Sequence, residues 1–114
     1  FRAMQLAAAT ALEAEADWYE GNNENYRNRR HLAGEIMKTL GCTYDEKQVG
    51  MFLWGKIPAS CKDVEELTEK VLHEARVFIT PGFIFGSNGA RYIRISLCCK
   101  DNKLAEALER IKRI

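Results

Sequence analysis

The sequence predicts an α+β fold: a two-layer sandwich in which helices cover one face of a small, mainly antiparallel three-stranded sheet. Three short segments are dense in apolar residues and are broken by Gly and Pro, as strands are. Longer segments between them carry apolar residues at helical spacing. The two kinds of segment alternate along 114 residues, which is enough for one domain with a core.

Four segments are expected to be helical. Arg2 to about Glu15 consists mainly of good helix formers, and its apolar residues crowd almost every position, so we expect it to pack against a further part of a longer protein. Asp17 to Leu40 follows, with Gly41 as its C-terminal cap. The remaining helices are expected over Ser60 to Ala75, capped by Asp63 or Ser60, and over Asp101 to Ile114, capped by Asp101 or Asn102.

Three segments are expected to be strands: Gln48 to Ile57, Val77 to Thr80 and Tyr92 to Leu97. The first has apolar residues on both faces, which predicts an internal or doubly covered strand. Inserting the last strand between the first two would satisfy the right-handed crossover rule. Strand parity then turns Ile93, Ile95 and Leu97 towards the helices and leaves Tyr92, Arg94 and Ser96 on the open face.

Composition excludes several classes of function. The net charge of +1 gives no field that would attract nucleic acid or an anionic membrane. No apolar run is long enough for a transmembrane helix. The four cysteines have no Cys-x-x-Cys spacing and there are only two histidines, so we expect no metal site and reduced thiols in a cytoplasmic protein. Arg27, Arg29 and Arg30 are expected on a solvated helix face.

The residue with the clearest chemical meaning is Arg94, which lies between Ile93 and Ile95. A desolvated arginine needs an anionic partner, and its planar fork of donors suits a carboxylate or a phosphate. Neither its strand nor the preceding glycine-rich loop, residues 81–90, contains an acidic residue. Arg91 is the alternative, but it lies at the junction of loop and strand, where we expect exposure. Arg94 is therefore the candidate anion-binding residue.

No catalytic set of residues is visible. His31 and His73 lie among charged helical residues, and no serine has an evident histidine partner. The string GFIFGS, residues 82–87, is faintly similar to the RNP1 motif of RNA-recognition domains. However, no basic residue precedes Gly82, and the net charge is near zero.

Three consecutive strings carry a resemblance to a known family: GMFLWGKIP (50–58), DVEELTEKVLHEARVFIT (63–80) and PGFIFGSNGARYIRIS (81–96). They resemble the C-terminal small domain of class I/II aminotransferases, pyridoxal-phosphate enzymes similar to aspartate aminotransferase. The resemblance implies that residues 1–16 are a helix from the large-domain side and that residues 17–114 form the small domain. It also implies that Arg94 binds the α-carboxylate of the substrate and that the glycine loop helps to close the site.

The resemblance further implies an enzyme that moves an amino group between an amino acid and a 2-oxo acid, as a homodimer with pyridoxal 5′-phosphate. The lysine and the aspartate that hold the cofactor in this family belong to the large domain, and none of the lysines here stands in that motif. We therefore expect residues 1–114 alone to be inactive, with no catalytic or cofactor-binding residue of their own. The alternative is a stand-alone α+β module that binds a small carboxylate ligand.

Overall fold

A three-stranded antiparallel sheet lies at the centre of the molecule, with its strands in the spatial order β1-β3-β2. The structure, a computed structural model, describes all 114 residues. Its helices and strands are α1 (Arg2–Leu12), α2 (Ala16–Thr39), β1 (Phe52–Lys56), α3 (Val64–Lys70), β2 (Thr80–Pro81), β3 (Tyr92–Ser96) and α4 (Asp101–Ile111). A π-helical turn, η1 (Val71–Ala75), follows α3, and two 3-10 turns, η2 (Gly82–Phe85) and η3 (Ser87–Gly89), precede β3. The predicted order and the α+β fold class are confirmed.

Strand β3 is the middle strand of the sheet and pairs with β1 on one side and β2 on the other. Both neighbours run antiparallel to β3, so β1 and β2 are parallel to each other and are joined by a crossover through α3. This is the insertion that the sequence predicts. The alternation is also as predicted, because Ile93 and Ile95 are buried while Tyr92 and Ser96 are exposed.

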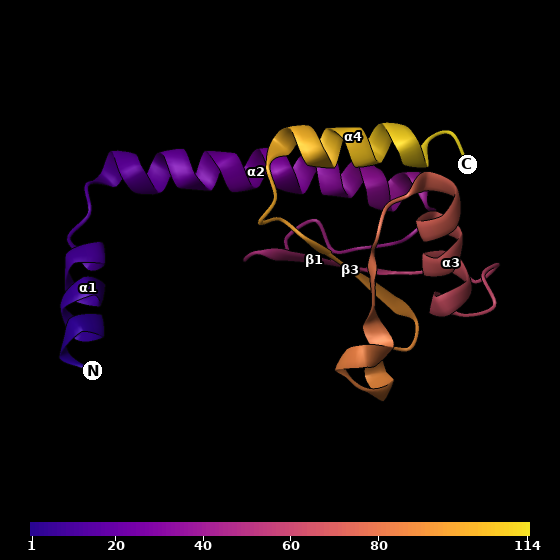
Figure 1. Cartoon of the computed structure of the whole chain (residues 1–114), viewed down its shortest axis with the longest axis horizontal. Coiled ribbons are helices and arrows are strands. Elements are labelled where there is room, and N and C mark those ends of the chain that lie inside the picture. The colour runs from indigo at the N-terminus through magenta and orange to yellow at the C-terminus, as the bar shows by residue number, and fades with distance from the viewer.

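Helices α2 and α4 lie side by side across one face of the sheet (Figure 1). One cluster of buried apolar side chains joins the two layers, and α3 contributes to it from the side. Burying one such side chain stabilises a fold by roughly 1.5–3 kcal/mol, so this cluster supplies most of the stability. Its largest members are Ile36, Met37, Leu53, Val64, Val71, Ile93, Leu97 and Ile111.

Helix α2 ends where the sequence predicts, at a glycine cap. Gly41 has a left-handed φ of +69°, which glycine adopts without steric cost. The N–H of Cys42 donates to the carbonyl of Met37 at 2.9 Å, and the N–H of Gly41 donates to that of Lys38 at 3.0 Å. This pair of bonds is a Schellman motif, and it turns the chain back towards the sheet.

Strand β1 lies at an edge of the sheet, so of the two predicted alternatives, internal or doubly covered, the second is the one observed. Both of its faces are nevertheless covered, because Leu53 is buried beneath the helices and Trp54 is half-buried against Phe85. The free edge is occupied by Gln48, whose side chain donates to the carbonyl of Trp54 at 2.8 Å and accepts from its N–H at 2.9 Å. These bonds take the place of a neighbouring strand.

The start of α4 is fixed by an ion pair rather than by a side-chain cap. Arg29 donates through Nε to the carboxylate of Asp101 at 2.9 Å and through Nη1 to the carbonyl of Leu97 at 3.2 Å. Asp101 lies in the first turn and Lys100 is the N-cap residue, so neither Asp101 nor Asn102 is the predicted cap. The reason is that Arg29 engages the carboxylate of Asp101 and thereby ties α4 to α2.

The prediction that Arg27, Arg29 and Arg30 lie on a solvated face of α2 is therefore wrong for two of the three. Arg29 and Arg30 are both half-buried, and Arg30 donates to the carbonyl of Gly50 at 2.6 Å. Only Arg27 is exposed, where it pairs with Glu24 one turn earlier. Arg30 thus attaches the segment before β1 to helix α2.

Helix α3 begins at Val64, and of the two predicted caps Asp63 is the one observed. Its carboxylate accepts from the N–H of Glu66 at 2.9 Å. The helix continues into the π-helical turn η1 and ends at Arg76, which has a left-handed φ of 56°. None of the helices has an apolar stretch of sufficient length to span a bilayer.

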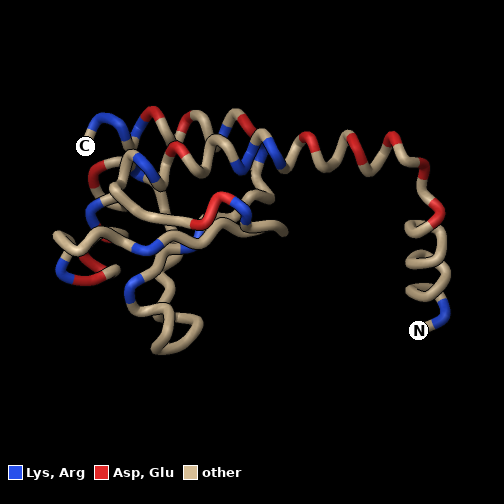
Figure 2. Tube along the Cα trace, turned by 180° about the vertical axis from the view of Figure 1, so that it is seen from behind, with Lys and Arg blue, Asp and Glu red and all other residues tan.

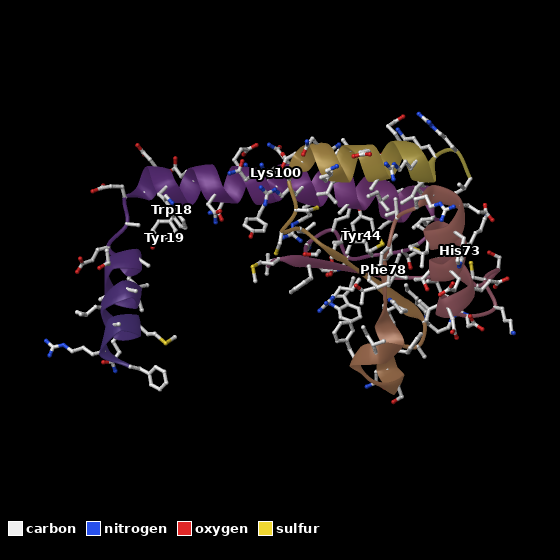
Figure 3. All side chains as sticks on the ribbon, viewed as in Figure 1. Trp18, Tyr19, Tyr44, His73, Phe78 and Lys100 are labelled. Atoms are coloured by element: carbon white, nitrogen blue, oxygen red, sulfur yellow. The ribbon has the colours of Figure 1, made fainter.

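Helix α1 stands apart from the rest of the fold, and the chain bends sharply between α1 and α2 (Figure 1). None of its residues is buried. At the bend between the two helices Trp18 and Tyr19 point towards one another, with their ring centroids 5.1 Å apart (Figure 3). A hollow of about 660 Å³ at this bend is lined only by apolar residues: Ala8, Ala11, Leu12, Ala14, Trp18 and Tyr19. Such an apolar surface is typical of an interface with another part of a protein.

Arg91 holds the loop after β1 against the start of β3. Its guanidinium donates to three main-chain carbonyls, those of Pro58, Cys61 and Lys62, at 2.7–2.9 Å. We expect Arg91→Ala to lower the free energy of unfolding by roughly 1.5–2 kcal/mol, because three acceptors lose a charged donor. Urea unfolding measures this, with Arg113→Ala in the exposed turn after α4 as the matched control. Equal midpoints for the two variants would contradict the role assigned to Arg91.

Candidate functional site

The candidate site lies on the open face of the sheet, on the side away from α2 and α4. Arg94 is at the centre of β3, with Trp54 opposite it on β1 and Thr80 opposite it on β2. Its guanidinium carbon lies 4.2 Å from the ring centroid of Phe52 and 4.0 Å from that of Phe85. Phe52 comes from β1 and Phe85 from η2, so a strand and a loop together position the arginine.

Arg94 has no anionic partner within the chain. The ion pairs of the structure all lie elsewhere, mostly along the helices. None of its nitrogen atoms is a buried donor without a partner, so they remain accessible to a ligand. The residue itself is half-buried. A half-buried guanidinium with apolar rings around it and accessible donors can bind an oxyanion edge-on.

The loop that carries Phe85 is closed by two glycines in contact. A Cβ on Gly89 would lie 2.0 Å from the carbonyl oxygen of Gly82, and one on Gly82 would lie 2.5 Å from that of Gly89. Glycine is required at both positions because the two backbones touch. The loop projects from the fold (Figure 1) and contains no charged residue along residues 82–90 (Figure 2). Its tip exposes Phe83, Ile84 and Phe85.

Arg91 does not share this surface. The sequence predicts exposure for Arg91, but it is half-buried and its donors are used by carbonyls of the chain itself. Trp54, by contrast, belongs to the site, because its ring meets that of Phe85 edge-on with centroids 5.4 Å apart. Sequence patterns indicate Arg94 and the glycines as site residues, but they indicate neither Phe52 nor Phe85. The sequence feature that could have pointed to Phe85 is the run Phe83-Ile84-Phe85, because three large apolar residues in a row are unusual in a loop.

The cavity that Arg94 borders does not lie where its guanidinium would bind a ligand. A cavity of about 270 Å³ is bordered by Arg94, but its other lining residues, such as Ile36 and Leu104, belong to the helix side of the sheet. The guanidinium lies on the opposite side, with Phe52 and Phe85. The arginine therefore faces an open surface, and this chain supplies one wall of any pocket there.

The nucleophilic and metal-binding side chains of the chain do not form a reactive centre. Burial raises the pKa of the Cys42 thiol to about 11, with a smaller contribution from Cys61, so Cys42 stays protonated at neutral pH. His73 lies on an exposed helix face and contacts Glu69 at 3.0 Å (Figure 3). No group of three or more His, Cys, Asp or Glu residues is placed to hold a metal ion.

The lysines of this chain do not suit a carbonyl cofactor. A lysine that forms a Schiff base is activated by desolvation or by a neighbouring cation, which lowers its pKa. All eight lysines here are exposed. The hydrogen bond and charge of Glu35 raise the pKa of Lys38 instead. The eight are Lys38, Lys47, Lys56, Lys62, Lys70, Lys100, Lys103 and Lys112.

Comparison with known proteins identifies the class to which this fold and site belong. Residues 1–111 match the family model "aminotransferase class I and II". The chain is 36% identical over 112 residues to LL-diaminopimelate aminotransferase of Desulforudis audaxviator, covering 98% of this chain and 28% of that protein. It is 31% identical over 115 residues to the transaminase BacF of Bacillus subtilis, covering 100% of this chain and 29% of BacF.

Solved structures agree with the sequence matches. Substrate-bound BacF of Bacillus subtilis superposes with a TM-score of 0.76 at 32% identity, over 99% of this chain and 29% of that one. An aromatic aminotransferase of Pyrococcus horikoshii superposes with a TM-score of 0.79 at 33% identity, over 96% of this chain and 30% of that one. The chain belongs to the class I and II aminotransferase family. It spans less than a third of the length of the relatives that it matches.

Proposed function

We propose that these residues are the C-terminal small domain of a pyridoxal-phosphate-dependent aminotransferase and that Arg94 binds the α-carboxylate of its substrates. The observation that supports this is an arginine without an anionic partner, fixed between two aromatic rings on the open face of a chain from this family. Amino acids and 2-oxo acids share the α-carboxylate, so one arginine serves both halves of the reaction. A bidentate contact would orient the substrate for transfer.

The cofactor would be held by residues outside this chain, because the lysines here do not suit it. When bound, pyridoxal phosphate stabilises the carbanion through which an amino group is exchanged. We propose that residues 17–114 form the small domain and that residues 1–16 lie against the large domain. The unburied α1 and the apolar hollow at Trp18 and Tyr19 support this division. The loop at 82–89 would form part of the lid over the substrate.

We further propose a homodimeric enzyme of amino-acid metabolism in the cytoplasm. The relatives act on LL-diaminopimelate or aromatic amino acids according to their names. These two are therefore the amino donors to try first, with a 2-oxo acid as the acceptor.

The proposal is tested by comparing the full-length protein that contains this chain with residues 1–114 alone. With pyridoxal phosphate, the full-length protein should transfer amino groups from at least one donor. The isolated chain should transfer none, and borohydride reduction with the cofactor should label no single lysine, as mass spectrometry would report. Transamination by the isolated chain would contradict the proposal. Tight binding of free amino acids by the isolated chain would instead support a stand-alone carboxylate-binding module.

A further inference from the structure

The contact between Arg94 and the loop at 82–89 suggests a role for a residue that is not itself a charged or polar group. The guanidinium carbon of Arg94 lies about as close to the ring of Phe85, 4.0 Å, as to the ring of Phe52, 4.2 Å. Both separations are well within the range of a cation–π contact. Phe52 belongs to the sheet, whereas Phe85 reaches the arginine from η2. The arginine is thus held by one rigid element and one loop.

The rings of Phe52 and Phe85 both lie close to the guanidinium of Arg94 without pairing with each other. Phe85 forms an aromatic pair with Trp54 but not with Phe52, although both phenylalanines lie about 4 Å from the same atom. With two aromatic rings packed close to its central carbon, the guanidinium offers its in-plane N–H groups to a ligand. An in-plane approach is the one that allows two parallel hydrogen bonds to a carboxylate.

Phe85 contacts Arg94 although its own side chain is only partly buried. About half of its surface, 49%, is exposed, and its neighbours Phe83 and Ile84 are likewise exposed at the tip of the loop. The close contact between Gly82 and Gly89 closes the base of the loop. The ring of Phe85 packs on Arg94 and on Trp54, and it is not part of the hydrophobic core.

We propose that Phe85 is a positioning residue, which packs on Arg94 together with Phe52 and fixes the guanidinium for edge-on binding of the substrate carboxylate. The inference rests on the proposed function of Arg94. A free arginine side chain loses rotamer freedom when it binds a ligand. Stacking removes that freedom before the ligand arrives, so the ligand binds more tightly. Losing the ring should weaken ground-state and transition-state binding alike, and hence raise KM with little change in kcat.

The test uses the full-length enzyme with the variants Phe85→Leu and Phe85→Tyr. Leucine keeps an apolar side chain of similar reach but has no π face, whereas tyrosine keeps the ring. We expect Phe85→Leu to raise KM for the amino acid and for the 2-oxo acid by roughly three- to tenfold, with kcat within about twofold. Phe85→Tyr should restore KM. Phe78→Leu replaces an exposed phenylalanine outside this loop that makes no cation–π contact with Arg94, so it is the matched control and should leave both constants unchanged.

A second measurement does not depend on activity. In full-length protein labelled with 15N-arginine and free of substrate, ring currents should shift the guanidinium proton of Arg94 upfield, and Arg94→Lys assigns the signal by its loss. Phe85→Leu should move this signal towards the position of an exposed arginine, and Phe78→Leu should not. An unmoved signal, or a KM unchanged in Phe85→Leu while Arg94→Lys raises it, would overturn the role of Phe85 alone. If Arg94→Lys also leaves KM unchanged, the proposed function of Arg94 fails as well.

Discussion

Replacing Arg94 with alanine in the full-length enzyme is expected to lower kcat/KM by roughly 100- to 1,000-fold for every amino-acid and 2-oxo-acid substrate. Truncating one partner of a desolvated, hydrogen-bonded charge pair costs about 2–5 kcal/mol, much of it because the other charge is left unpaired. Arg94 has no partner within the chain that could take over the substrate, and Arg91 is already engaged with three carbonyls. Steady-state kinetics with two unrelated amino donors would measure the effect.

Two further variants separate geometry from charge. Arg94→Lys keeps the positive charge but loses the planar fork, so its kcat/KM should fall between those of the wild type and Arg94→Ala. Arg113→Ala removes an arginine from the exposed turn after α4 and should have no effect. The loss should be the same for different donors, since the α-carboxylate is common to them. A loss confined to one donor would place Arg94 at the substrate side chain, and no loss at all would remove it from the site.

Replacing Gly89 with alanine is expected to lower the free energy of unfolding by about 3 kcal/mol, at the upper end of the usual cost of overpacking. The new methyl group would lie 2.0 Å from the carbonyl oxygen of Gly82, a backbone atom that has no rotamer by which to move away. The loop at 82–89 must therefore open at its base. Urea unfolding followed by circular dichroism gives the free energy, and hydrogen exchange of residues 82–90 localises the change.

Gly21→Ala is the matched control for Gly89→Ala. Gly21 lies on the exposed part of α2, and nothing would come within 4 Å of its added Cβ. Alanine is more stable than glycine inside a helix, so this variant should raise the free energy of unfolding by about 0.5–1 kcal/mol. Opposite signs for the two substitutions would attribute the effect to the contact between Gly82 and Gly89. A neutral or stabilising Gly89→Ala would mean that the loop is not closed at its base.

Local patterns were sufficient to predict the helices and the central strand. The cap at Gly41 follows from the one residue type that adopts a left-handed φ without cost, and Asp63 follows from its preference for N-cap positions. The place of β3 between its neighbours follows from the short strand–helix–strand crossover. Strand parity alone put Arg94 on the face opposite to the core. Each of these depends on residues that are close together along the chain.

The errors in the prediction all involve partners that are distant along the chain. Arg29 was expected in solvent, and it pairs with Asp101, 72 positions later. The same pairing takes Asp101 away from its expected role as a helix cap. Arg91 was expected to be exposed, and its guanidinium donates to three main-chain carbonyls that lie 29–33 positions earlier. Periodicity reports which face of an element is apolar, and it carries no information on which segment covers that face.

For the candidate site, the amino-acid sequence is enough to predict an arginine without an acidic neighbour in a β-strand, a glycine-rich loop before it and the aminotransferase family. Only the folded structure shows that Phe52 and Phe85 pack on this arginine and that Gly82 and Gly89 close the loop. The two differ because the type and parity of Arg94 are local properties. A cation–π contact depends instead on where the folded chain brings two rings to within about 4 Å of one atom.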